Sequence, residues 1–204
     1  MTRWLTLYAR SRRLPVALAA SLGAVLLIWV GWTKWSQNRE VPLSLTVLTI
    51  ALALAPLIPT LAGDDDALES TAALRWPRRR VLHLTAGFAV VTLALLASQA
   101  TGTWFGPAGQ IIRDTAGLTG LIGLGAALMG TRMAWPVPIS WTAIQLLVGG
   151  GDATGWRQML FWLTQPAGNR VAAITAGVFF VAGAVAYGLR PGPPAAPAEA
   201  TMGA

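Results

Sequence analysis

Residues 41–80 read VPLSLTVLTIALALAPLIPTLAGDDDALESTAALRWPRRR. The stretch Val41–Gly63 carries no charged side chain, and it is bounded by Glu40 and Asp64. About 20 apolar residues, each rising about 1.5 Å, cross a hydrocarbon core of about 30 Å as a helix. This stretch therefore predicts a membrane-spanning helix that is followed by a strongly charged loop.

Five further intervals are long and free of Asp, Glu, Lys and Arg. In the longest of them, Gly102, Gly106 and Pro107 predict that the helix ends near Thr101. We therefore predict an all-α integral membrane protein with one domain of six transmembrane helices over residues 1–190. The Pro- and Ala-rich residues 191–204 are expected to be a disordered cytoplasmic tail. The five intervals are Leu14–Thr33, Val81–Ile112, Thr115–Thr131, Met133–Gly151 and Val171–Leu189.

The composition supports a membrane protein. The 204 residues are 54% hydrophobic and 11% charged, whereas soluble domains contain about 25% charged residues. The mean hydropathy is +0.57. The net charge of +7 comes from cations between apolar stretches, a pattern typical of membrane proteins rather than of nucleic-acid binding.

The distribution of cations predicts the orientation. With a cytoplasmic N-terminus, ten cations lie inside and five outside, which favours two cytoplasmic termini in a bacterial cell membrane. The inner set is Arg3, Arg10, Arg12, Arg13, Arg75, Arg78, Arg79, Arg80, Arg132 and Arg190, and the outer set is Lys34, Arg39, Arg113, Arg157 and Arg170.

Several classes of site are excluded by residue type. The absence of cysteine excludes disulfides, thiolate zinc sites, iron–sulfur clusters and a cysteine nucleophile. The single histidine, His83, excludes HExxH zinc sites, and the single lysine, Lys34, is followed by Trp35, so the phosphate-binding GxxxxGK[ST] loop is absent. We expect no catalytic, metal or cofactor-binding residue, and any ATP and magnesium would bind a partner.

Few ionisable groups fall near the predicted spans. His83 is expected to form an interfacial hydrogen bond, and Arg113 and Asp114 are expected to cap a helix and reach the outer membrane surface. Because no charge lies in the middle of a predicted span, an ion-coupled pump is disfavoured.

The loop Gly63–Arg80 contains both acidic and basic groups. Three aspartates precede the helix-forming stretch Ala67–Arg75, and Pro77 is expected to end that helix before the arginines. The arginines can serve topology alone, but topology does not require the aspartates or Glu69. We therefore expect a short helix on the cytoplasmic surface that docks on another protein.

An aromatic segment is predicted on the outer side. The stretch Trp156–Thr164 is too short to span, so it is expected to be a short re-entrant or interfacial helix, or an aromatic belt that anchors the sixth span. Its candidate residues are Trp156, Met159, Phe161 and Trp162.

Small residues recur along the fourth span. Their spacing permits close helix packing, either within the chain or between two copies. They are Ala116, Gly117, Gly120, Gly123, Ala127 and Gly130.

With six spans, a charged helix after the second and a helical element before the sixth, the chain resembles the membrane subunits of ABC-2 type ABC transporters. In that family an acidic residue, a Thr-Leu-containing turn and a proline with basic residues follow the second span. Here Glu69, Ser70, Thr71, Leu74, Pro77, Arg78, Arg79 and Arg80 stand in that order. The phrase LESTAALRWPRRRVLHL also resembles small permease-like proteins of actinobacteria.

The resemblance implies that Ala67–Trp76 is a coupling helix that enters an ATP-binding cassette subunit. It implies a transport subunit, with export favoured, that pairs with a second copy or a related permease. The alternatives are an accessory or assembly protein, and a membrane enzyme, for which the sequence offers no converging polar groups. The implied partner-coupling residues are Asp64, Asp65, Asp66, Glu69, Thr71, Leu74, Arg75, Pro77, Arg78, Arg79 and Arg80.

Overall fold

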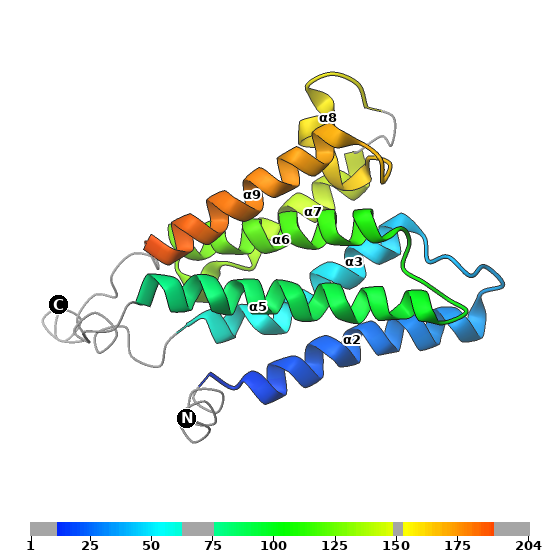
Figure 1. Ribbon diagram of the computed structural model, residues 1–204, viewed down its shortest axis with the longest axis horizontal. Helices are drawn as coiled ribbons and strands as arrows, with labels where there is room; N and C mark the ends of the chain where they lie inside the picture. Colours follow the sequence, from blue (N-terminus) through cyan, green and yellow to red (C-terminus); the bar gives the residue numbers. More distant parts are fainter. Residues whose placement is uncertain (1–11, 63–75, 149–152, 190–204) are drawn as a thin grey trace, which may run out of the picture.

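The computed structural model describes residues 12–62, 76–148 and 153–189, so the predicted tail 191–204 lies outside the described residues. These ranges form helices and turns, with one isolated β-bridge between Glu40 and Trp104 (Figure 1). The α-helices are α2 (Leu14–Trp35), α3 (Leu43–Leu54), α5 (Trp76–Ala97), α6 (Ala108–Met129), α7 (Pro136–Val148), α8 (Arg157–Leu160) and α9 (Arg170–Leu189). The 3₁₀ helices are η1 (Ala55–Leu61), η2 (Ser98–Ala100), η3 (Thr131–Met133) and η4 (Trp162–Thr164).

Five helical stretches are long and apolar enough to cross a membrane. Large apolar side chains on their outer faces are exposed, as expected for helices that face lipid. The described chain is therefore that of a multi-pass α-helical membrane protein. The five stretches are Leu14–Trp35, Leu43–Leu61, Pro77–Ala100, Ala108–Met129 and Arg170–Leu189.

The predicted fifth span, Met133–Gly151, contains only the 13-residue helix α7 among its described residues. At about 1.5 Å per residue, α7 is about 20 Å long, which is shorter than a hydrocarbon core. Pro136 and Pro138 begin this helix, and proline is best tolerated in the first turn.

The second predicted span changes its helix type midway. It begins as α3 and continues as η1 from Ala55. Pro56 and Pro59 lack the N–H that an α-helix would use, so the backbone tightens into a 3₁₀ helix over these residues.

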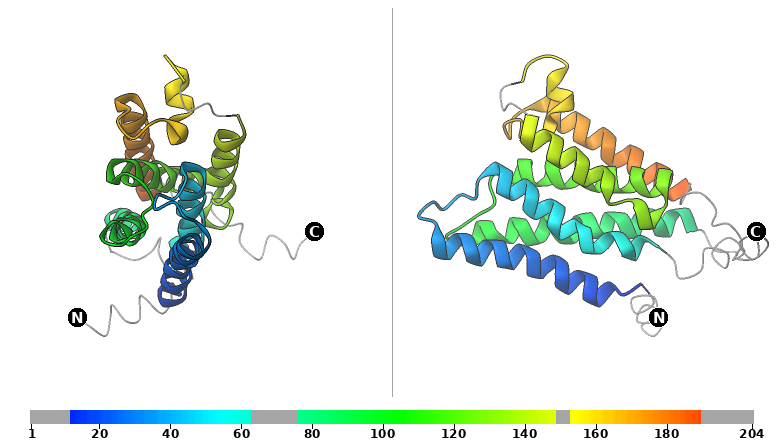
Figure 2. Two further views of the ribbon diagram at one scale, coloured as in Figure 1. Left: turned by 90° about the vertical axis from the view of Figure 1, so that its right-hand side faces the viewer. Right: turned by 180° about the vertical axis from the view of Figure 1, so that it is seen from behind.

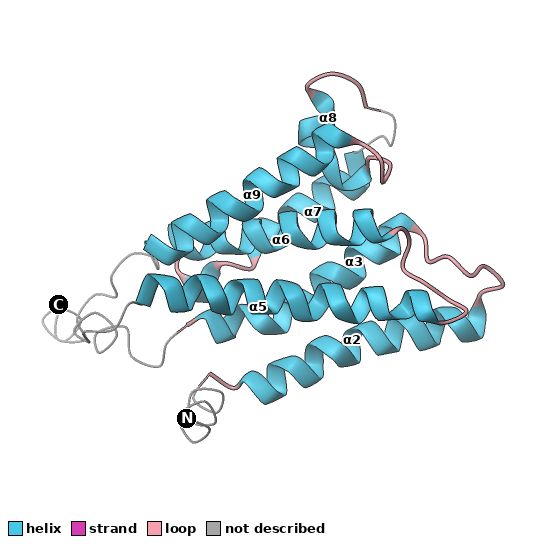
Figure 3. Cartoon of the chain, viewed as in Figure 1, coloured by secondary structure: helices cyan, strands magenta, loops and turns pink. Residues whose placement is uncertain are grey.

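Successive long helices run in opposite directions, which creates two ends of the bundle (Figures 1 and 2). The Arg12 end contains the starts of α2, α5 and α7 and the ends of η1, α6 and α9. The Trp104 end contains the connections 36–42 and 101–107 and the segment 153–169 (Figure 3).

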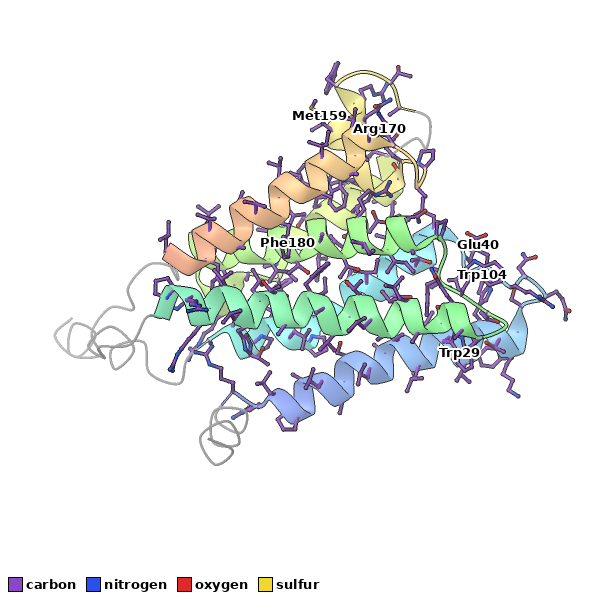
Figure 4. The ribbon with its side chains drawn as sticks, in the orientation of Figure 1. Trp29, Glu40, Trp104, Met159, Arg170 and Phe180 are labelled. Atoms are coloured by element: carbon purple, nitrogen blue, oxygen red, sulfur yellow. The ribbon has the colours of Figure 1, made fainter. Side chains whose placement is uncertain are left out.

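Two connections are tied together at the Trp104 end. The Val41 N–H donates to the Trp104 carbonyl over 2.9 Å, and the Trp104 N–H donates to the Arg39 carbonyl over 3.0 Å. The indole N–H of Trp29 on α2 donates to the Thr103 carbonyl over 3.0 Å. Trp29, Glu40 and Trp104 gather at this end in Figure 4. These bonds satisfy backbone groups of the two connections, which have no partner within a helix.

Helix α6 lies at the centre of the bundle and packs most closely against α9. A Cβ atom added at Gly120 would collide with the backbone of Phe179, and one added at Gly183 would collide with the backbone of Gly120. The ring of Trp162 covers Gly117 in the same way. Small residues of the fourth span are therefore used for packing within the chain.

Candidate functional site

Most of the candidate coupling residues lie in segment 63–75, which is outside the described residues. The structure describes the residues on either side of it, which are called its two flanks below. Pro77, Arg78, Arg79 and Arg80 are described, and Leu61 lies just before the segment. The other candidates lie outside the described residues: Asp64, Asp65, Asp66, Glu69, Thr71, Leu74 and Arg75.

The flank at the end of η1 is held by two other helices. The Tyr187 hydroxyl, on α9, donates to the Leu61 carbonyl over 2.6 Å. Arg12, just before α2, donates from Nη1 to the carbonyls of Thr60 and Leu61, each over 3.1 Å. Tyr187 is fully buried and Arg12 is buried. The end of η1 is thus joined to α2 and α9 at once.

His83 adds a third connection at this flank. Its Nε2 atom lies 2.9 Å from Thr60 Oγ1, while the Thr60 hydroxyl donates to the Leu57 carbonyl over 2.6 Å. Since a hydroxyl has one proton, the Thr60 oxygen accepts from Nε2–H of His83. The hydrogen bond expected for His83 is therefore present, and it joins α5 to η1.

The second flank is the first turn of α5. Helix α5 begins at Trp76, so Pro77 is its second residue and the three arginines belong to its first turns. Trp76, expected to end the coupling helix, is thus the first residue of α5. The sequence had instead started the third span at Val81, after the arginines. A Cβ atom added at Gly188, on α9, would lie 2.9 Å from Val81 Cγ2 and 3.5 Å from the Pro77 carbonyl. The end of α9 therefore packs against both flanks.

The arginines of α5 occupy the positive end of its helix dipole. A cation there is disfavoured by about 0.3–1 kcal/mol, because the free N–H groups carry partial positive charge. Arg78 is exposed, and Arg79 and Arg80 are half-buried. The helix dipole therefore does not explain the position of this cluster.

The aromatic segment near residue 160 contains one α-helical turn and one 3₁₀ turn. Trp156 and Met159 are 70% and 55% exposed, whereas Trp162 is fully buried against Gly117 of α6. Phe161 is half-buried, with the Arg157 guanidinium 5.8 Å from its ring centroid. Met159 lies at the tip of the Trp104 end in Figure 4. Trp162 thus anchors the segment to the bundle, whereas the side chains of Trp156 and Met159 are exposed.

A buried ion pair fixes this segment, and its placement corrects the expectation for Arg113 and Asp114. Helix α6 begins at Ala108, so both residues lie within the helix, with side chains 2% and 0% exposed. Arg113 Nε donates to Asp114 Oδ1 over 2.7 Å. The expectation that they reach the membrane surface is wrong, because the helix starts earlier and turns both side chains inward.

Arg113 and Gln145 hold η4 from two helices. Arg113 donates from Nη1 to the Pro166 carbonyl over 3.0 Å and from Nη2 to the Leu163 carbonyl over 3.5 Å. Gln145 Oε1, on α7, accepts from the Leu163 N–H over 3.0 Å. The sequence analysis did not identify Gln145. Its sequence signal is a second polar residue, Thr142, three positions earlier and so on the same face of α7, and both side chains are buried.

Among the described residues no group of three or more His, Asp or Glu could hold a metal ion. Comparison with protein-family models, curated proteins and solved structures finds no match to this chain. The resemblance to ABC-2 membrane subunits therefore rests on the residues quoted from the sequence.

Proposed function

We propose that this chain is a transmembrane subunit of an ATP-driven ABC transporter, with export favoured. In this proposal Ala67–Trp76, most of which lies in segment 63–75, is the coupling helix, and separate ATP-binding subunits supply the energy. Two copies, or this chain and a related permease, form the complex in a bacterial cell membrane.

The observation that carries the proposal is the attachment of both flanks of the segment to α9. Leu61 is bonded to Tyr187, and Pro77 packs against Gly188. A force applied to the segment would reach α9 and then α6, because α6 and α9 pack backbone to backbone at Gly120 and Gly183. A coupling element needs this kind of rigid connection, whereas a loop with only a topological role does not.

The charge distribution supports a cytoplasmic Arg12 end. Six described cations lie there, and five lie at the Trp104 end, of which Arg113 is buried. The described cations alone are nearly balanced, and it is the ten-to-five count over the full sequence that favours a cytoplasmic Arg12 end under the positive-inside rule. The six are Arg12, Arg13, Arg78, Arg79, Arg80 and Arg132, and the five are Lys34, Arg39, Arg113, Arg157 and Arg170.

The proposal includes α7 as a sixth, short crossing, with segment 156–164 at the outer surface as a re-entrant or interfacial element. It is supported by the direction of α7, which runs from the Arg12 end to the Trp104 end in Figures 1 and 2. Local thinning of the bilayer accommodates a short span at modest cost.

The transport pathway would lie between two membrane subunits. Helix α6 fills the centre of the described bundle. Helix α9 packs so closely against it that a Cβ atom at Gly120 would collide with the backbone of Phe179. A pathway along a subunit interface avoids opening this packed core.

The test is co-purification with an ATP-binding subunit encoded beside this chain, together with ATP hydrolysis in reconstituted membranes. Glu69→Arg should weaken assembly strongly, since disrupting one partner of a desolvated charged contact costs about 2–5 kcal/mol. Asp65→Asn serves as the control, because a rim charge contributes about 1 kcal/mol or less.

Deletion of Leu68–Ala73 should abolish both assembly and stimulation of the ATPase. Gel filtration establishes that each variant is folded. If Glu69→Arg and the deletion both leave assembly and ATP hydrolysis intact, the coupling assignment is wrong, and the accessory-protein alternative is favoured.

A further inference from the structure

An apolar cavity of about 190 Å³ lies between α2, η1, α5 and α6. Its wall is almost entirely hydrocarbon, and its polar side chains are Thr60, His83 and Thr119. Thr60 and His83 are hydrogen-bonded to each other. The apolar wall includes Leu14, Leu18, Leu57, Leu84, Gly87 and Phe88.

The chemistry of this wall favours a hydrocarbon occupant over water. A buried water needs about two to four polar partners, whereas Thr119 has the one side-chain hydroxyl in the wall that is not already paired. An apolar cavity of about 150 Å³ accepts a benzene ring, so this cavity has room for about six to eight carbons. That volume matches part of one acyl chain rather than a whole lipid.

The cavity lies beside a surface that faces lipid. Helix α2 lies near the end of α5 at Trp29, which lines one hollow with Ala94 and Ala97, and diverges from α5 toward its own first residue (Figures 1 and 4). Ala86 on α5 lines the cavity and is exposed at the surface. The bilayer therefore supplies hydrocarbon directly at the mouth of the cavity.

A basic hollow of about 330 Å³ lies next to the cavity at the Arg12 end. It is lined by Arg12, Arg13, Pro59 and Ala62, among others, and it shares Thr60 with the cavity. Arg12 is committed to the carbonyls of Thr60 and Leu61, whereas the side chain of Arg13 is exposed. Basic pockets between transmembrane helices favour anionic headgroups at the membrane surface.

We propose that the cavity and the basic hollow together bind one anionic phospholipid of the bilayer. One acyl chain enters the cavity beside Gly87, and the phosphate lies against Arg13. The positive charge of Arg13 favours an anionic headgroup. The apolar wall of the cavity favours a lipid with an acyl chain over a soluble anion. This site is independent of the proposed transport function.

Native mass spectrometry of the full chain in detergent, titrated with phosphatidylglycerol or phosphatidylcholine, tests the site. The wild type should retain one phosphatidylglycerol in preference to phosphatidylcholine. Gly87→Leu should lower the affinity for both lipids about tenfold, because the new side chain fills the cavity. Gly177→Leu is the matched control, because a Cβ atom there meets nothing within 4 Å.

Arg13→Gln should weaken binding of phosphatidylglycerol more than that of phosphatidylcholine, because the choline cation already offsets the phosphate charge, and so reduce the preference for phosphatidylglycerol about fivefold. Lys34→Gln, which removes an exposed cation at the Trp104 end, should leave the preference unchanged. Ala86→Leu, at the exposed mouth of the cavity, is the second variant if Gly87→Leu does not fold.

Three outcomes would overturn the proposal. One is unchanged binding in a folded cavity variant, and another is an equal loss in Gly177→Leu, which would indicate only general coating by lipid. The third is a preference for phosphatidylglycerol that survives Arg13→Gln.

Discussion

The hydroxyl of Tyr187 donates a hydrogen bond of 2.6 Å to the carbonyl of Leu61, which lies 126 positions earlier in the chain. Tyr187 is in the last turn of α9, and Leu61 is the last residue of η1. This bond ties the last described helix to the second predicted span at the edge of segment 63–75. The end of α9 is therefore fixed to the end of η1, the last described element before that segment.

Tyr187→Phe should lower the free energy of unfolding by about 1 kcal/mol, since it removes one net hydrogen bond while keeping the ring. Equilibrium unfolding in mixed micelles of a mild detergent and dodecyl sulfate measures the change. The control is Thr175→Val, because Thr175 bonds within α9 to the Val171 carbonyl and joins no second helix. Equal losses in the two variants would contradict a role for the Tyr187 bond in joining helices.

Breaking the ion pair between Arg113 and Asp114 should destabilise the protein far more than Tyr187→Phe does. Arg113→Met should cost about 3–5 kcal/mol, because it leaves a buried carboxylate without its partner. Adding Asp114→Leu should restore part of this loss, since the unpaired charge is then gone. The same unfolding assay checks both variants, and a double variant less stable than Arg113→Met would contradict this account.

Much of the fold follows from simple regularities in the sequence. Intervals without charged residues gave four of the five stretches able to cross a membrane to within about seven residues at each end, because the cost of charge in a bilayer keeps most charged residues outside the spans. The third helix also ends near Thr101 as expected, with η2 finishing at Ala100. These features depend on local composition alone.

The tertiary contacts could not be predicted in the same way. Arg113 and Asp114 look like interfacial charges in the sequence, but the earlier start of α6 at Ala108 places them inside the bundle. The backbone partners of Arg113, at Leu163 and Pro166, are about fifty residues away. The bond between Tyr187 and Leu61 likewise depends on packing between distant helices, which no local pattern encodes.

The contact between α6 and α9 predicts opposite effects for two glycine substitutions. Gly120→Ala should destabilise the protein by several kcal/mol, because its Cβ atom would collide with the backbone of Phe179. Gly177→Ala should be neutral or stabilising by up to about 1 kcal/mol, since its Cβ atom meets nothing within 4 Å and alanine favours the helix. Thermal unfolding in detergent separates the two, and equal effects would contradict this packing.

Spin labels on the two sides of segment 156–164 should differ in mobility. A spin label at Trp156 should be mobile, because that side chain is 70% exposed, while one at Leu163 should be immobile or unfold the protein, because Leu163 is fully buried. Accessibility to oxygen and to a water-soluble relaxation agent measures the depth of Met159. Free access of water to every labelled position would contradict a re-entrant or interfacial element.

The native chain contains no cysteine, so single-cysteine labelling tests the proposed topology without background. Asn38→Cys and Thr154→Cys should react with a membrane-impermeant maleimide in intact cells, whereas Ala62→Cys and Arg132→Cys should react only after the membrane is opened. The decisive comparison is Thr154 with Arg132, because they lie on either side of α7. If α7 crosses, the two react from opposite sides and the count is six. If both react from the same side, α7 does not cross, and the termini then lie on opposite sides of the membrane, which would contradict the proposed coupling subunit with two cytoplasmic ends.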